Sequence, residues 1–113
     1  MIKYRVVLVS FPFDDLSASK VRPAVCLTEP IGPHRHVVLA FITSRVPADL
    51  LATDLVLAAS QPDFSSAGLR VSSTLQLHRL VTATPSLIKR ELGVLSPQIQ
   101  LQIKERIRKL FEL

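Results

Sequence analysis

Arg22 and Thr43 are the residues whose types and positions could do chemistry. Arg22 stands directly before Pro23 at the start of an apolar segment, and Thr43 ends another apolar segment about twenty residues later. A planar guanidinium can donate two parallel hydrogen bonds to phosphate oxygens, and a hydroxyl group can orient the phosphate or an attacking group. Together they could stabilise the charge that grows on a phosphate when a ribose 2′-hydroxyl attacks it.

Both residues also have an ordinary structural interpretation. An arginine before a proline at a strand start commonly forms a surface ion pair, and a threonine at a strand end commonly satisfies a local backbone group. The residue types alone therefore leave catalysis and structure open.

Motifs for other reaction classes are absent from the sequence. It contains no Walker loop, G-x-G-x-x-G, G-x-S-x-G or H-E-x-x-H, so the corresponding nucleotide-binding, hydrolase and zinc-protease hypotheses lose their usual support. His34 and His36 could bind a metal only if further ligands converged, and a solvated turn or phosphate contacts are favoured. Asp14 and Asp15 are adjacent, which favours a loop or capping role. We therefore expect no metal ion and no other cofactor.

Composition indicates one small domain. The chain has 113 residues, of which 48% are hydrophobic and 20% charged, as in soluble globular proteins, and residues 1–113 suffice for one core. Cys26 is the single cysteine, so no intrachain disulfide forms, and a cytoplasmic location is expected. The apolar runs are too short to cross a membrane, and no leader precedes them. The net charge of +5 favours a polyanionic partner.

Short apolar segments predict a mainly β fold. The segment from His36 to Thr43 is continuously apolar, which predicts a central strand. In the segment from Ser73, Leu75 and Leu77 alternate with Gln76 and His78, as in a half-buried strand. The predicted strands are Arg5 to Ser10, Arg22 to Thr28, His36 to Thr43, Asp54 to Ala58, and a segment from Ser73 that Leu80 to Ala83 continues or pairs with. Asp14 to Lys20 and Gln61 to Leu69 are predicted loops.

Two helices are predicted at the end of the chain. Thr84-Pro85 and Ser96-Pro97 each place a capping hydroxyl before a proline, which is tolerated at the first helical position. Gly93 is predicted to end the first helix. In the second, an apolar stripe should pack on the sheet; it comprises Ile99, Ile103, Ile107 and Leu110.

Several segments in order resemble the MazF/PemK family of toxin–antitoxin ribonucleases. The most specific part is Arg22-Pro23-Ala24 followed by Ile42-Thr43-Ser44. The other matching segments are Val7 to Phe13, Asp15, Lys20 to Val25, Ala40 to Ser44, Gly68-Leu69 with Ser73, and Leu92-Gly93 with Leu95-Ser96. The resemblance covers nearly the whole chain.

The resemblance implies an SH3-like barrel of the MazF/CcdB/PemK toxin type, mainly β with C-terminal helices. It further implies a homodimer, a cognate antitoxin, and metal-independent cleavage of single-stranded RNA such as mRNA. Arg22 matches the family's catalytic arginine and Thr43 its catalytic hydroxyl residue, with Ser44 as a neighbour.

Further side chains are candidate substrate contacts. Phe11 and Phe13 could stack on bases, although at least one of them is expected in the core. The remaining candidates could equally be solvated surface residues; they are Lys20, Arg45, Gln76 and Arg79.

The chain departs from the family pattern at two places. Relatives usually open the first strand with a Gly-Asp pair, where this chain has Tyr4-Arg5, and His78 stands where an acidic residue is common. Two other functions therefore stay open: a CcdB-like toxin that inhibits a topoisomerase, and a catalytically inactive RNA-binding domain.

Overall fold

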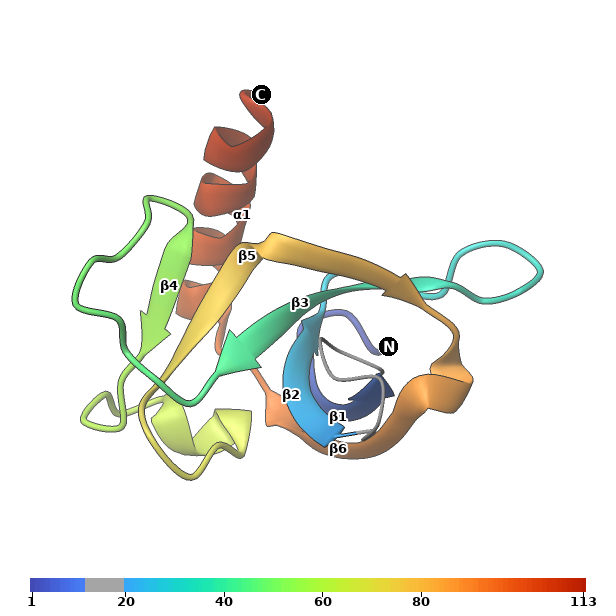
Figure 1. Cartoon of the computed structure of the whole chain (residues 1–113), viewed down its shortest axis with the longest axis horizontal. Helices are drawn as coiled ribbons and strands as arrows, with labels where there is room; N and C mark the ends of the chain where they lie inside the picture. Colours follow the sequence, from blue (N-terminus) through green and yellow to red (C-terminus); the bar gives the residue numbers. More distant parts are fainter. Residues whose placement is uncertain (12–19) are drawn as a thin grey trace.

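The computed structural model describes residues 1–11 and 20–113, with the side chains of Phe11 and Lys20 excluded. Six described strands form one antiparallel sheet in the order β4-β5-β3-β2-β1-β6. A helix, α1, packs on one side of the sheet, and its C-terminal part extends beyond the sheet edge (Figure 1). The elements are β1 (Arg5–Phe11), β2 (Lys20–Cys26), β3 (Val37–Thr43), β4 (Asp54–Leu57), η1 (Phe64–Ala67), β5 (Ser73–Ala83), η2 (Pro85–Leu87), β6 (Ile88–Val94) and α1 (Pro97–Phe111).

The described buried side chains form two clusters, one on each face of the sheet. The face covered by α1, here called the helix face, holds Ala40, Ile42 and Leu75 against Ile99 and Ile103 of the helix. The opposite face holds a second cluster, in which Val7, Val9, Ala24, Leu39 and Phe41 are buried. Because successive side chains of a strand point to opposite faces, β3 contributes to both clusters. This two-sided burial confirms the central strand predicted at this position.

β5 bends where its register with β3 changes. Ala40 pairs with Leu80, but the next residue, Phe41, pairs with Gln76, so residues 77–79 have no partner on β3. Leu77 packs on the helix face, whereas Val81 packs on the opposite face. The extra residues therefore reverse the side-chain alternation and bend the strand, as Figure 1 shows. Ser73 to Ala83 forms one strand, so Leu80 to Ala83 continues the predicted strand.

The first of the two predicted C-terminal helices is wrong. Thr84-Pro85 begins only the short turn η2, and the Thr84 hydroxyl makes no capping hydrogen bond within the described part of the chain. Residues 88–94 instead form β6, which pairs with β1. Gly93 lies inside this strand because a Cβ there would come within 2.1 Å of the Ser66 carbonyl oxygen. Tertiary pairing has overridden the local helix signals.

The second predicted helix is confirmed. Ser96 caps α1 by accepting a hydrogen bond from the Ile99 backbone N–H, and Pro97 occupies the first turn. Ile99 and Ile103 are fully buried, and Ile107 packs against the same cluster. The loop predicted over residues 61–69 contains the short 3-10 turn η1, while Phe13, Asp14 and Asp15 lie outside the described residues.

Candidate functional site

Arg22 and Thr43 lie on neighbouring strands and on the same face of the sheet. Val9 of β1 pairs with Arg22, and on the other side Ala24 of β2 pairs with Phe41 of β3. This β2–β3 pairing ends at Ala24 and Phe41, so Arg22 and Thr43 lie two residues beyond its last pair, at the same end of the two neighbouring strands. Both side chains point to the face opposite α1, as Ala24 and Phe41 do. Arg22 is exposed and Thr43 is half-buried, so substrate could reach them from this face.

On the same face, two residues along β3 from Thr43, Phe41 is flanked by an amide and a second guanidinium. Phe41 pairs with Gln76 across β3 and β5. The Arg79 guanidinium lies 5.7 Å from the centre of the Phe41 ring, and its Nη1 donates a hydrogen bond of 3.4 Å to Gln76 Oε1. Gln76 and Arg79 therefore lie together beside Phe41, two residues along β3 from Thr43. Their N–H groups can donate hydrogen bonds to the same bound molecule.

A buried carboxylate of β4 lies beside Gln76 and close to a histidine of β5. Asp54 pairs with Gln76, and its side chain is 3% exposed. Its Oδ2 accepts a hydrogen bond from the Leu51 backbone N–H at 3.0 Å, while Nδ1 of His78 lies 4.0 Å from its Oδ1. Sequence reasoning did not select Asp54, since only the strand register reveals its position beside Gln76.

Ser44 and Arg45 follow β3 and lie in different surroundings from Thr43. Ser44 lines a cavity of about 420 Å³ together with Pro23. The Arg45 backbone carbonyl accepts a hydrogen bond from the Thr74 hydroxyl at 2.7 Å, which fixes the chain as it leaves β3. Arg70 and Arg90, which were not among the predicted site residues, also line the cavity. Its other lining residues are Leu8, Gly68, Leu69, Val71, Ser73 and Leu92.

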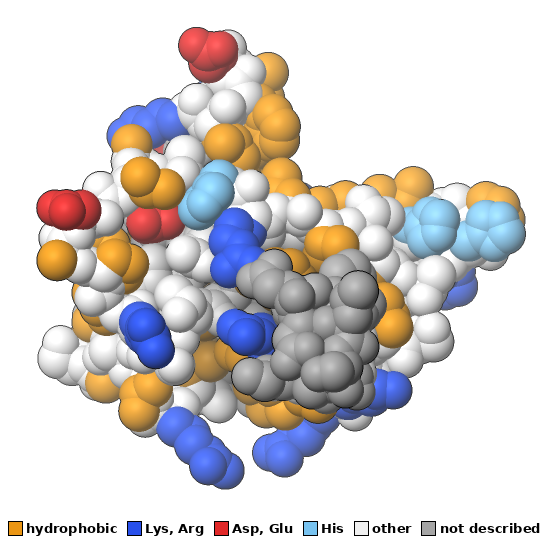
Figure 2. All heavy atoms as spheres, viewed as in Figure 1, with side chains coloured by type: hydrophobic (Ala, Val, Ile, Leu, Met, Phe, Trp, Pro, Cys, Tyr) orange, Lys and Arg blue, Asp and Glu red, His pale blue; other side chains and the backbone are white. Residues whose placement is uncertain are grey.

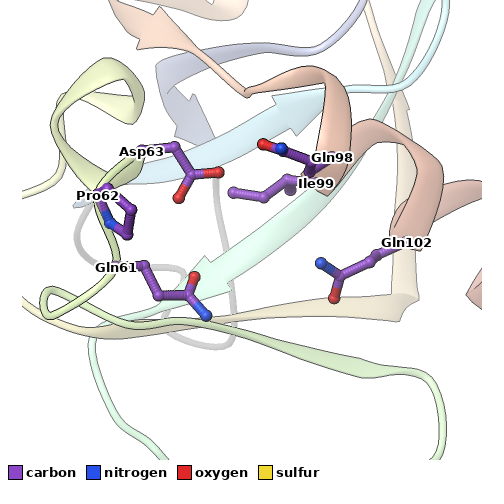
Figure 3. A pocket seen from close by; sticks show the side chains of 6 residues that line it. All are labelled: Gln61, Pro62, Asp63, Gln98, Ile99 and Gln102. Atoms are coloured by element: carbon purple, nitrogen blue, oxygen red, sulfur yellow. The ribbon is translucent and has the colours of Figure 1, made fainter.

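A further cavity, of about 480 Å³, lies between the segment before η1 and the first turns of α1. Figure 3 shows that Gln61, Pro62 and Asp63 line one side of it, and that Gln98, Ile99 and Gln102 line the other. None of the residues that line this cavity is one of the predicted site residues.

Basic side chains are spread over much of the molecular face shown in Figure 2, whereas the acidic ones visible there lie toward one side and near the C-terminus. This distribution fits the net charge of +5. A surface of this kind gains free energy from polyanions because binding releases their condensed counterions.

Tyr4 and Arg5, where the chain departs from the family pattern, are held by contacts with neighbouring segments. Tyr4 has a φ of 69°, a left-handed conformation in which glycine is favoured. Its backbone N–H donates to the Cys26 carbonyl, and its carbonyl accepts from the Leu95 N–H. Arg5 pairs with Glu91 of β6. These residues therefore tie the start of β1 to its neighbours.

Cys26 does not supply a nucleophile. Its side chain is fully buried on the face opposite α1. Burial first, and then the negative charges of Glu91 and Glu29, raise the pKa of the thiol to about 11. The thiol therefore stays protonated and unreactive at neutral pH.

The described residues have neither a cluster of metal ligands nor a membrane-spanning helix. Residues 1–11 and 20–113 hold no cluster of three or more His, Cys, Asp or Glu side chains suited to a metal ion. The rings of His34 and His36 stack in the turn before β3, with centroids 5.7 Å apart. The helix in the described part of the chain is not long and apolar enough to span a membrane.

The model of the PemK-like, MazF-like toxins of type II toxin–antitoxin systems matches residues 3–111. The chain belongs to this family. No curated protein sequence matches it. Membership confirms the resemblance found in the sequence, and the mainly β, MazF-like fold is confirmed with one α-helix in the described residues instead of two.

Solved structures of toxins share the fold at low sequence identity. The Mycobacterium tuberculosis toxin MazF-mt6 aligns with a TM-score of 0.73 and 22% identity, over 96% of this chain and 97% of that one. An endoribonuclease in complex with its cognate antitoxin, from a mycobacterial species, aligns with a TM-score of 0.71 and 13% identity, over 100% and 96%. MazF of Deinococcus radiodurans aligns with a TM-score of 0.70 and 16% identity, over 100% and 97%.

Proposed function

We propose that this chain is an endoribonuclease toxin that cleaves single-stranded RNA by a metal-independent reaction. Its membership of the MazF-like toxin family supports the proposal, as does the likeness to a structure described as an endoribonuclease. The observation that supports it most is that Arg22 and Thr43 lie at the same end of two neighbouring strands and that Gln76 and Arg79 flank Phe41 on the same face.

The reaction uses a nucleophile that the RNA itself provides. The 2′-oxygen attacks the adjacent phosphorus and loses its proton, the bond from phosphorus to the 5′-oxygen breaks, and that oxygen gains a proton as it leaves. Arg22 stabilises the negative charge on the non-bridging oxygens through paired hydrogen bonds. Thr43 orients the phosphate or the attacking hydroxyl. DNA lacks the 2′-hydroxyl and is not cleaved.

Other residues bind the flanking nucleotides. Gln76 and Arg79 lie close enough to share one ligand, and they contact the RNA beside the scissile bond. Ser44 and Arg45 follow Thr43 and extend the binding surface past the end of β3. Phe11 and Phe13 are proposed as base-stacking residues, and Lys20 as a phosphate contact.

The toxin is proposed to act in the cytoplasm as a homodimer that a cognate antitoxin neutralises. One structural neighbour is a complex with its own antitoxin. The net charge of +5 on this chain favours an antitoxin segment with acidic side chains, because such a segment would compete with RNA for the same basic face.

The test is cleavage of a long single-stranded RNA by the pure protein in EDTA. We expect fragments with 2′,3′-cyclic phosphate and 5′-hydroxyl ends. Arg22→Ala should lower the cleavage rate by roughly 10²–10³-fold, as the loss of a transition-state hydrogen-bond donor does. Arg22→Lys keeps the charge but not the planar pair of donors, and it should retain only part of the rate. Thr43→Val should lower the rate by on the order of tenfold.

Arg108→Ala is the matched control. It removes an exposed arginine from the last turn of α1, so it changes the net charge equally without touching the site. The proposal is wrong if Arg22→Ala cleaves like the Arg108 variant, or if RNA stays intact in EDTA. Intact RNA together with growth arrest on expression would instead indicate inhibition of a protein target.

A further inference from the structure

Asp54 presents a buried carboxylate oxygen that lacks a hydrogen bond. Its side chain is 3% exposed, and Oδ1 has no hydrogen-bond partner among the described residues. Nδ1 of His78 lies 4.0 Å from this oxygen, and the His78 side chain is 38% exposed. That distance is too long for a hydrogen bond but short enough for strong attraction between charges. A buried unsatisfied carboxylate is costly.

His78 occupies the unpaired stretch of β5. Residues 77–79 have no partner on β3, and the first of them, Leu77, is buried on the helix face. His78 is thereby directed to the opposite face, on which Arg79 contacts Phe41 and Gln76. The imidazole therefore lies on the proposed RNA face, with its carboxylate partner behind it on β4.

We propose that His78, held by Asp54, binds with Arg79 a phosphate of an RNA nucleotide next to the scissile bond. This inference rests on the proposed function for the identity of the ligand. His78 follows Thr74, the partner of Thr43, by four residues, at most about 13 Å along the chain. We therefore assign it to a neighbouring phosphate and leave the scissile phosphate to Arg22 and Thr43. A protonated imidazole and a guanidinium are a donor pair suited to a neighbouring phosphate.

The charges around His78 link RNA binding to its protonation. The charged side chains on the elements around His78 are Asp54 of β4, Arg79 of β5 and Arg106 of α1; Nε of Arg106 donates to the Asp54 backbone carbonyl at 3.0 Å. β3 contributes the uncharged Ala40 and Phe41 beside this stretch. A bound phosphate offsets the repulsion between His78 and Arg79. RNA affinity should therefore rise as the pH falls through the range in which imidazoles gain a proton.

The experiment measures binding of a fully 2′-O-methylated RNA oligonucleotide, which cannot be cleaved by attack of its 2′-oxygen. The wild-type protein should bind roughly fivefold more tightly at about pH 6 than at about pH 8. His78→Gln should lose this gain, and its salt dependence at the lower pH should weaken by about 0.7 in the log–log slope, as for one lost contact to a single strand. His36→Gln, in the exposed turn before β3, is the control and should keep the gain.

Two further variants separate a binding role from a structural one. His78→Lys carries its charge at both pH values, so it should bind at the higher pH as tightly as the wild-type protein does at the lower one. Asp54→Asn keeps the shape and an acceptor for the Leu51 N–H, and it should reduce the gain on acidification. Equal gains in the wild-type, His78→Gln and His36→Gln proteins would overturn the inference.

The outcome does not depend on cleavage. Loss of the pH effect in His78→Gln supports the phosphate contact even if the wild-type protein leaves natural RNA intact, in which case the proposed function alone fails. Conversely, cleavage that requires Arg22, combined with an unchanged pH effect in His78→Gln, refutes the role of His78 alone.

Discussion

A Cβ atom on Gly68 would lie 2.1 Å from the backbone carbonyl oxygen of Leu92. Gly93, the next residue of β6, meets η1 equally closely, since its own Cβ would lie 2.1 Å from the Ser66 carbonyl oxygen. Both glycines lie in segments that resemble the MazF/PemK family, and any larger residue at either position would clash with backbone. η1 and β6 pack backbone to backbone at one wall of the cavity that Ser44 and Pro23 line.

Gly68→Ala should therefore destabilise the protein by roughly 2–4 kcal/mol, because the new methyl group meets backbone that cannot move aside and because φ is +73°. Gly32→Ala is the matched control. Gly32 has a similar φ of +72°, but a Cβ there would meet no described atom within 4 Å, so only the conformational cost of about 1 kcal/mol applies. Urea denaturation of both variants measures the difference, and equal losses would contradict this account of the η1–β6 contact.

The cap of α1 extends beyond the helix to Asp63. Ser96 Oγ accepts from the Ile99 N–H at 3.3 Å and donates to Asp63 Oδ2 at 2.5 Å. Ser96→Ala should cost about 1–2 kcal/mol, since it removes the cap and leaves the half-buried Asp63 oxygen without this donor. Thr84→Ala is the comparison, because Thr84 precedes a proline in the same way but makes no capping bond in the described structure. Thermal unfolding should show a clear loss for the first variant and a small one for the second.

The sequence predicted the elements whose side chains carry a strong period and missed those that depend on partners. β3 and β5 were predictable because Leu39, Leu75 and Leu77 are fully buried and mark the sheet faces. β6 was missed because Lys89, Arg90 and Glu91 are exposed and its pairing partner, β1, is distant in the sequence. Thr84-Pro85 and Gly93 meanwhile imitate the two ends of a helix.

The candidate site divides in the same way. Arg22 and Thr43 could be selected because each borders an apolar strand, and their being on facing strands follows from simple antiparallel pairing. The approach of Asp54 to His78 could not be predicted, since it depends on the register of β4 with β5 and on the unpaired residues 77–79. The roles of these residues in RNA cleavage stay proposals.

Glu29 links the N-terminus to the end of β2 in a pH-dependent way. Its two carboxylate oxygens accept hydrogen bonds from the Ile2 and Lys3 backbone N–H groups. The Ile2 hydrogen bond is the largest cause that lowers the pKa of this carboxyl. Because the folded pKa is lower than the unfolded one, the stabilisation is present above the unfolded value and is lost as the pH falls through the folded value. Glu29→Gln should thus lower Tm at about pH 7 more than at about pH 3; equal shifts at both pH values would refute the linkage.

Cys26 gives a readout of opening at the centre of the sheet. The thiol is fully buried, and burial with the nearby charges of Glu91 and Glu29 raises its pKa to about 11. A thiol-reactive disulfide reagent at about pH 8 should therefore modify the native protein only through unfolding, at a rate that urea increases. Since a raised pKa favours the protonated thiol in the folded state, its contribution is full below the unfolded value and is lost as the pH rises toward 11. A Cys26→Ala variant should lose less stability than the wild-type protein between about pH 8 and pH 11. Rapid labelling of the folded protein would show that the thiol is accessible and that this description of the sheet interior is wrong.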